Sequence, residues 1–306
     1  MRPAWSVILL TTLIGAGQGL FLALLVVELA SVPPVGFVVV CCLVSFGLLA
    51  GGLIASFFHL GRPSRAWRAA SQWRTSWLSR EVIVLPAFMA AVAAYGAAVY
   101  LDLDRPLSLA IGALGVLLCV ALFVCTAMIY ACLKFLQEWH SPFTLLNYFL
   151  LGTASGFTLA VPLAVLAHHR FAGPLALAAF WLSAAAWLVR GASLVRNARL
   201  QPKSTTQSAI GIAQPKVEQK SQGFMGGSFN TREFFHGKPK PVVGAVRLLF
   251  MILIFPIPAL LLGWGGGSLA SFFAAFVTQF LGLLAERWYF FAEARHPQNL
   301  YYQSMA

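Results

Sequence analysis

The chain alternates between apolar stretches and polar intervals, and eight of the apolar stretches are about 20 residues long, enough for a helix to cross the roughly 30 Å hydrocarbon core of a bilayer. The predicted spans are residues 5–28, 34–58, 81–101, 107–133, 143–167, 173–194, 243–263 and 268–290. The pattern therefore predicts an all-α fold, an integral membrane bundle of eight transmembrane helices that forms a single membrane domain over residues 1–306.

Turn-forming residues separate the predicted spans. Pro33-Pro34, Ser141-Pro142 and Gly173-Pro174 stand in three of the short intervals, where a helix has to end. The one long polar segment, residues 195–241, is rich in Gln, Lys, Ser and Gly and is too polar to be a span. It predicts a long loop between the sixth and seventh helices.

The composition excludes a water-soluble enzyme. Hydrophobic residues make up 59% of the chain and charged residues only 10%. Soluble domains carry about 25% charged residues. A chain this apolar would expose much of its hydrophobic surface to water, so the composition places it in lipid.

The charged residues are distributed unevenly over the predicted topology. Lys and Arg number 21 against 9 Asp and Glu, which gives a net charge of +12. An even number of spans puts both termini on one side, and among the basic residues only Arg105 and Arg170 then fall on the other. Because basic loops stay in the cytoplasm, both termini and the 195–241 loop are predicted to be cytoplasmic, in a bacterial inner membrane. The charge thus indicates topology and a docking surface rather than nucleic-acid binding.

The interval between the second and third spans is a basic and aromatic loop bounded by His59 and Glu81. Its arginines and tryptophans suit the lipid headgroup region, so an interfacial anchor is one interpretation. That interpretation does not account for a His and a Glu at the edges of apolar helices, where ionisable groups are costly without a cavity or a partner. The pair has the chemistry to hydrogen-bond a quinone carbonyl and handle its protons. A structural ion pair is the alternative.

Two motifs carry a family resemblance. The sequences His59-Leu-Gly-Arg-Pro and Trp73-Arg-Thr-Ser-Trp-Leu-Ser-Arg-Glu81, with the eight-span layout, resemble the membrane anchor subunit of dimethyl-sulfoxide-reductase-type molybdoenzymes. The segment from Glu286 to Asn299 resembles the branch of that family found with quinone-linked sulfite dehydrogenases. The resemblance implies that the chain holds an iron–sulfur subunit, which contacts a catalytic subunit bearing molybdopterin. It also implies that His59 and Glu81 bind quinone.

The resemblance further implies where the electrons go. In the sulfite branch the catalytic subunits are cytoplasmic, which agrees with the predicted side of the long loop. We therefore expect electrons from sulfite to reach a quinone beside His59 and Glu81, through metal centres held only by partner subunits, and no catalytic residue for sulfite in this chain. Two alternatives stay open: an anchor of a quinol-oxidising reductase of a sulfoxide or another oxyanion, and a purely structural anchor without a quinone site.

The same loop is expected to complete the quinone site. Its arginines are expected to orient the quinone or to seat an acidic surface of the partner, and its tryptophans to form apolar walls. The residues concerned are Arg62, Arg65, Arg68, Trp67, Trp73 and Trp77.

A second candidate surface lies in the long loop, where residues 223–238 mix aromatic and basic side chains. We expect it to fold against the iron–sulfur partner, with the phenylalanines as apolar anchors. The residues concerned are Phe224, Phe229, Arg232, Phe234 and Phe235. An amphipathic stretch lying on lipid headgroups is the alternative.

No haem or other metal site is predicted in this chain. A haem iron with two axial histidines needs them on facing helices, and the predicted topology places no histidine pair at mid-membrane. Only His59 with His140 stays open. None of the five cysteines forms a CxxC motif.

Two features of the first and last spans predict contacts between helices. Gly15, Gly17 and Gly19 predict a close approach of another helix. Glu286 and Glu293 lie about two turns apart on one face of the last span. Pairing of these carboxylates with the arginines of the 59–81 loop is favoured over a proton route to the quinone.

Overall fold

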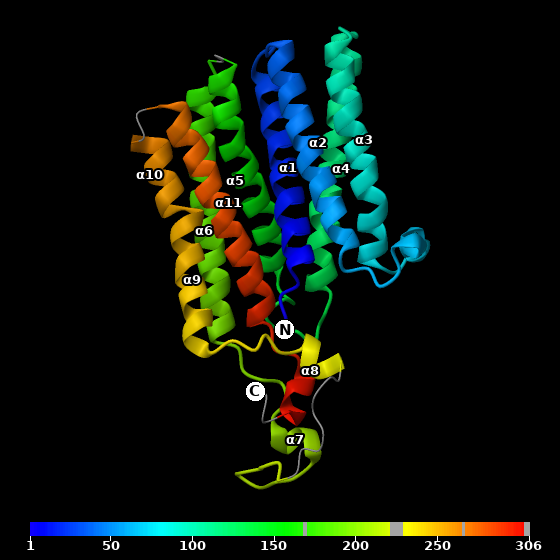
Figure 1. Ribbon diagram of the computed structural model, residues 1–306, viewed down its shortest axis with the longest axis vertical. Coiled ribbons are helices and arrows are strands. Elements are labelled where there is room, and N and C mark those ends of the chain that lie inside the picture. The colour runs from blue at the N-terminus through cyan, green and yellow to red at the C-terminus, as the bar shows by residue number, and fades with distance from the viewer. Residues whose placement is uncertain (168–169, 221–228, 265–266, 303–306) are drawn as a thin grey trace.

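The computed structural model describes residues 1–167, 170–220, 229–264 and 267–302. Over these ranges the chain forms helices and no strand, and eight helices are long and apolar enough to cross a membrane. This confirms the predicted class and number of spans, and Figure 1 shows them side by side in one bundle. The spans are α1 (Trp5–Ala30), α2 (Val35–Phe57), α3 (Trp77–Tyr100), α4 (Arg105–Ala131), α5 (Pro142–Leu166), α6 (Ala172–Ala198), α9 (Lys240–Ile254) continued by α10 (Pro256–Trp264), and α11 (Leu269–Glu293).

The seventh span is broken, although the sequence predicts one continuous helix over 243–263. α9 ends at Ile254, Phe255 leaves the helical conformation with φ −132° and ψ −58°, and α10 starts at Pro256. Proline lacks the N–H that would bond to the preceding turn, and its ring clashes with that turn. The proline therefore divides the span into two helices.

The centre of the bundle is formed by α1 and α5, which approach closely at glycines. A Cβ atom added to Gly156 would lie 2.0 Å from the carbonyl carbon of Gly19, and one added to Gly15 would lie 3.3 Å from the Cα atom of Gly152. Small residues allow such backbone contact between membrane helices. The predicted close approach at Gly15 and Gly19 is confirmed, and Gly17 meets α2 in the same way, at the carbonyl oxygen of Ser45.

Both chain termini lie at one end of the bundle, together with the 3-10 helix η1 (Pro63–Gln72) and the polar segment between α6 and α9 (Figure 1). This end is called the loop end below. The polar segment contains α7 (Thr206–Ile210) and α8 (Phe229–Glu233), and η2 (Pro297–Tyr301) follows α11. The Met1 amine donates to the carbonyl oxygen of Ala294 at 2.7 Å, and the Arg2 amide donates to that of Glu233 at 2.9 Å. The first residues are thus held by the end of the chain and by α8.

Candidate functional site

Glu81 is a buried carboxylate near the loop end of α3. The helix begins at Trp77, where the Ser76 hydroxyl accepts a hydrogen bond from the Ser79 amide. Glu81 therefore stands in the second turn and is only 6% exposed. The hydroxyl of Thr126 in α4 donates to its Oε1 atom at 2.5 Å. A carboxylate in this setting is able to exchange protons with a neighbouring group away from bulk water.

His59 lies just beyond α2 and is exposed. Desolvation by its neighbours lowers the pKa of the imidazole below its ordinary value, so the ring is neutral at pH 7. A neutral imidazole offers one N–H donor and one acceptor nitrogen. Within the described ranges no hydrogen bond or ion pair joins His59 to Glu81, whose carboxylate turns toward α4. The two predicted quinone ligands therefore share the loop end without touching, and their role stays a prediction.

The arginines and tryptophans of the 59–81 loop form an exposed surface. Arg62, Arg65 and Arg68 are exposed, and so are Trp67 and Trp73, at 72% and 52%. The guanidinium carbon of Arg68 lies 5.4 Å from the centroid of the Trp67 ring, which is within the range of cation–π attraction. Because these side chains are exposed, any wall that they form needs a partner subunit or lipid on its other side.

Among the tryptophans of this loop, Trp77 makes the shortest contact with an arginine. It is half-buried, and the Arg80 guanidinium carbon lies 4.2 Å from its ring centroid. Arg80 also donates to the carbonyl oxygens of Trp73 and Arg74, at 2.9 and 2.8 Å. Arg80 thereby fixes the backbone between η1 and α3.

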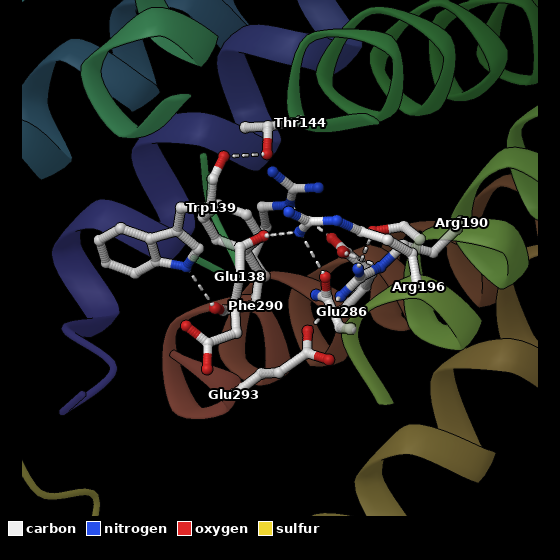
Figure 2. A network of polar contacts seen from close by, with 11 residues as sticks. Glu138, Trp139, Thr144, Arg190, Arg196, Glu286, Phe290 and Glu293 are labelled. Atoms are coloured by element: carbon white, nitrogen blue, oxygen red, sulfur yellow. Dashed lines mark hydrogen bonds and ion pairs between the residues drawn. The ribbon is translucent and has the colours of Figure 1, made fainter. Parts of the chain in front are cut away.

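A second cluster of charges is buried between α6 and α11 (Figure 2). The Nε atom of Arg190 lies 2.7 Å from Glu286 Oε1, and the Nε atom of Arg287 lies 2.5 Å from Glu286 Oε2. The Arg190 guanidinium also reaches Glu293, at 3.7 Å. Arg190 and Glu286 are 1% and 0% exposed at their side chains, whereas Glu293 is 14% exposed. Buried charges of this kind are tolerated because two cations face two anions.

The predicted pairing of Glu286 and Glu293 with arginines of the 59–81 loop is therefore wrong. Their partners are Arg190, on α6, and Arg287, the next residue along α11. The predicted topology counted Arg190, like every basic residue except Arg105 and Arg170, on the side of the termini. Its position inside the apolar run 173–194 was the available signal, because a charged residue inside a span needs a buried partner.

A small cavity separates this cluster from Glu81. It has a volume of about 30 Å³ and is lined by residues of α1, α4, α5 and α11, among them Thr11, Thr12, Thr126, Tyr148 and Arg287. Thr126 joins the cavity to Glu81, and the Arg287 guanidinium carbon lies 4.1 Å from the centroid of the Tyr148 ring. A series of polar side chains, called the polar layer below, thus crosses the bundle. The polar layer consists of Glu81, Thr126, Tyr148, Arg287, Glu286, Arg190 and Glu293.

Some of the predicted docking residues of the long loop contact another part of the chain, and others are exposed. Phe234 stacks on the His296 ring, with centroids 3.7 Å apart, and Phe235 meets the Tyr302 ring edge-on at 6.0 Å. Phe229 and Arg232 are exposed, while Phe224 lies outside the described residues. Two of the predicted anchors thus pack on the C-terminal segment of their own chain, and docking to a partner stays a prediction.

His140, which the sequence left open as a second haem ligand beside His59, forms a hydrogen bond with the backbone. Its Nδ1 atom lies 2.6 Å from the carbonyl oxygen of Ala131. The described parts of the chain contain no group of three or more His, Cys, Asp or Glu side chains arranged to hold a metal ion. The expectation of no haem stays a prediction.

Comparison with known proteins gives two similarities. Residues 1–218 match the family described as the DMSO reductase anchor subunit (DmsC). The chain is also 52% identical over 325 aligned positions to a sulfite dehydrogenase subunit of Allochromatium vinosum, and the alignment covers 100% of both chains.

Proposed function

Because this chain belongs to the DMSO reductase anchor subunit family, we propose that it anchors a sulfite-oxidising molybdenum complex and passes its electrons to membrane quinone. Sulfite and water give sulfate, two protons and two electrons at a partner subunit that bears molybdopterin. An iron–sulfur subunit carries the electrons to this chain. The quinone takes up two electrons and two protons and leaves as quinol, and this chain contributes no catalytic residue for sulfite itself.

The observation that carries the proposal is the buried Glu81 carboxylate, hydrogen-bonded to Thr126 and placed at the end of the bundle where the basic 59–81 loop lies. Ionisable groups at such depth are costly and mark sites of ion or substrate handling. Glu81 acts as proton donor to one quinone oxygen, and the neutral imidazole of His59 hydrogen-bonds the other. The quinone headgroup lies between them, at the membrane surface.

The exposure of Arg62, Arg65 and Arg68 favours the second of their expected roles, which is to seat an acidic surface of the iron–sulfur subunit. Exposed arginines flanked by tryptophans are typical of protein interfaces. Docking at this loop brings the last iron–sulfur cluster next to the quinone. The partner subunits then lie on the side of the loop end, and the excess of basic residues at that end favours the cytoplasm of a bacterium.

The test is quinone reduction by the purified complex with sulfite as donor, measured with short-chain ubiquinone and menaquinone analogues. His59→Ala and Glu81→Gln are each compared with Glu218→Gln, an exposed glutamate of the long loop. We expect both site variants to lower quinone reduction by roughly 10²-fold or more. Sulfite-dependent reduction of a soluble dye, which bypasses the quinone, should stay unchanged.

Three results would contradict parts of this proposal. Normal quinone reduction in both site variants would remove the site at His59 and Glu81. Quinone reduction that fails together with dye reduction would assign His59 and Glu81 a role in assembly of the complex instead of quinone binding. A wild-type complex that does not oxidise sulfite would remove the substrate while leaving the anchor.

A further inference from the structure

We propose that the polar layer conducts protons sideways through the bundle, from Glu293 at the loop end to Glu81, and so supplies the protons that quinone reduction consumes. This inference rests on the proposed quinone site at Glu81. The iron–sulfur partner supplies the two electrons, and two protons from the water at the loop end finish on the two quinone oxygens.

The polar layer runs across the bundle rather than through the membrane. Glu81, Thr126, Tyr148, Glu286 and Arg190 each lie about 6–12 Å from the loop end of their helix, at a rise of 1.5 Å per residue. They belong to α3, α4, α5, α11 and α6. In Figure 1, α6 and α11 lie on one side of α1, and α3 and α4 lie on the other. A proton that enters at Glu293, at the end of α11, therefore first moves about 10 Å inward to Glu286. From there it stays at nearly constant depth and ends beneath the 59–81 loop.

Glu293 is the natural entrance. It is the partly exposed member of the buried charge cluster and sits at the last residue of α11. Figure 2 shows the Glu138 side chain at the same place, so two carboxylates stand at the point where the layer meets the loop end. Neighbouring surface carboxylates attract protons and hold them briefly, and this favours uptake here.

The buried charges pass the proton on rather than trap it. Arg190 and Arg287 balance Glu286 and Glu293, so an extra proton on either carboxylate leaves one uncompensated positive charge in the interior. Such a charge is unfavourable, and the proton moves onward. Arginine keeps its own protons in proteins, so the carriers are the carboxylates, the Tyr148 hydroxyl and water.

The cavity provides the connection between the two ends of the layer. Its volume of about 30 Å³ holds one or two water molecules. The Thr11 and Thr12 hydroxyls donate to backbone carbonyls of their own helix, so they turn oxygen lone pairs toward the cavity. The guanidinium of Arg287 and the hydroxyl of Tyr148 are buried and interact with each other, and beyond this contact neither the Arg287 Nη1 group nor the Tyr148 hydroxyl makes a well-aligned hydrogen bond within the described residues. Water in the cavity accepts from these donors and reaches Thr126, the neighbour of Glu81.

A purely structural cluster would need none of these features. Arg190, Glu286, Arg287 and Glu293 neutralise one another without the cavity. Neither the Thr11 and Thr12 hydroxyls nor the hydrogen bond from Thr126 to Glu81 contributes to that balance. The continuity from a surface carboxylate to the carboxylate of the quinone site is the reason to assign conduction.

The experiment uses the complete complex in lipid nanodiscs, with sulfite as donor and a short-chain quinone as acceptor, in H₂O and in D₂O. Tyr148→Phe removes one carrier without changing charge, and Glu293→Gln removes the entrance close to the surface, where folding is least affected. Tyr95→Phe, at a fully buried tyrosine of α3 away from the layer, is the matched control for the first. Glu218→Gln is the control for the second.

We expect quinone reduction to be at least about tenfold slower in each layer variant. This loss is smaller than removal of a general acid or base usually causes, because water partly replaces the missing group. The solvent isotope effect should rise, and sulfite-to-dye electron transfer should be normal. Acetate, a small proton carrier, should restore the rate of Glu293→Gln, which it cannot do if the residue only holds the helices together. The two controls should match the wild type.

Wild-type rates and isotope effects in both layer variants would overturn the proposal. The quinone site would still stand if Glu81→Gln remained defective in the same preparation. A slow Glu293→Gln complex that acetate does not rescue would assign the cluster a structural role. A normal Glu81→Gln complex would remove the quinone site and, with it, the destination of the layer.

Discussion

The hydroxyl of Thr126 in α4 donates a 2.5 Å hydrogen bond to the carboxylate of Glu81 in α3, across 45 residues of sequence. Both residues are buried, at 5% and 6% exposure. The bond directs one oxygen of the carboxylate toward α4. The interior arrangement of the helices, and not the loop alone, therefore determines where this carboxylate points.

Removal of that hydroxyl should weaken quinone reduction. Thr126→Val keeps nearly the same shape but leaves Glu81 without its hydrogen-bond donor. We expect quinone reduction to fall several-fold, with sulfite-to-dye transfer unchanged, because the carboxylate is less well positioned. Thr158→Val is the matched control, since the Thr158 hydroxyl donates only to Ala154 of its own helix. Equal rates in the two variants would show that the bond does not position Glu81.

Glu286→Gln should destabilise the chain strongly. The substitution leaves Arg190 and Arg287 buried with one anion fewer, and breaking a buried pair in this way costs about 3–5 kcal/mol. Thermal unfolding of the detergent-solubilised chain measures the effect as a lower midpoint. Glu218→Gln breaks an exposed pair with Lys220 and should change stability by less than about 0.5 kcal/mol. A wild-type midpoint for Glu286→Gln would mean that this carboxylate does not hold the arginines.

Gly156→Ala should separate α1 from α5. The new Cβ atom would overlap the backbone at Gly19 and Leu20, which cannot move aside as a flexible side chain can. Overpacking typically costs about 1–3 kcal/mol, and more where backbone is the obstacle. The yield of folded chain and its unfolding midpoint should both drop. Gly47→Ala, in α2 with nothing within 4 Å of the added Cβ, should behave like the wild type and serves as control.

Docking of the N-terminus should weaken as the pH falls. Burial lowers the pKa of the Met1 amine from 8.0 to about 6, and Glu138 only partly offsets this effect. The docked amine is neutral above pH 6, whereas an undocked amine takes up a proton between pH 8 and pH 6. Docking is therefore strongest above pH 8 and loses about 2–3 kcal/mol by pH 6. Hydrogen exchange of the first residues should speed up over this range, and a rate independent of pH, after correction for intrinsic exchange, would contradict the shift.

The loop end should face the cytoplasm. A fluorescent protein fused to the C-terminus should be fluorescent in a bacterial host, and alkaline phosphatase fused at the same place should be inactive. The same reporters inserted between α3 and α4, next to Asp102, should give the opposite result. The C-terminus is the better fusion site because the Met1 amine is engaged with Ala294. Active phosphatase at the C-terminus would invert the topology.

The sequence indicated the candidate site residues more readily than the contacts around them. His59 and Glu81 were identified as ionisable groups at helix edges, where the cost of burial makes them conspicuous. Thr126 and Tyr148 were not identified, because a lone hydroxyl in an apolar run is ordinary and becomes informative only when its neighbour is known. The partners of Glu286 were predicted wrongly because the sequence does not show which helices adjoin, although the position of Arg190 inside an apolar run indicated that it needs a buried partner.

The sequence by itself determined the number and approximate bounds of the spans, because the length and hydropathy of a run decide whether it crosses a bilayer, whatever its neighbours are. Only the tertiary structure decided which helices meet. Arg190 faces Glu286 because α6 and α11 lie near each other in the bundle, and Thr126 meets Glu81 because α4 packs on α3. Hydropathy is a property of single segments, whereas these contacts depend on the rotation and order of helices, which packing between small and large side chains selects.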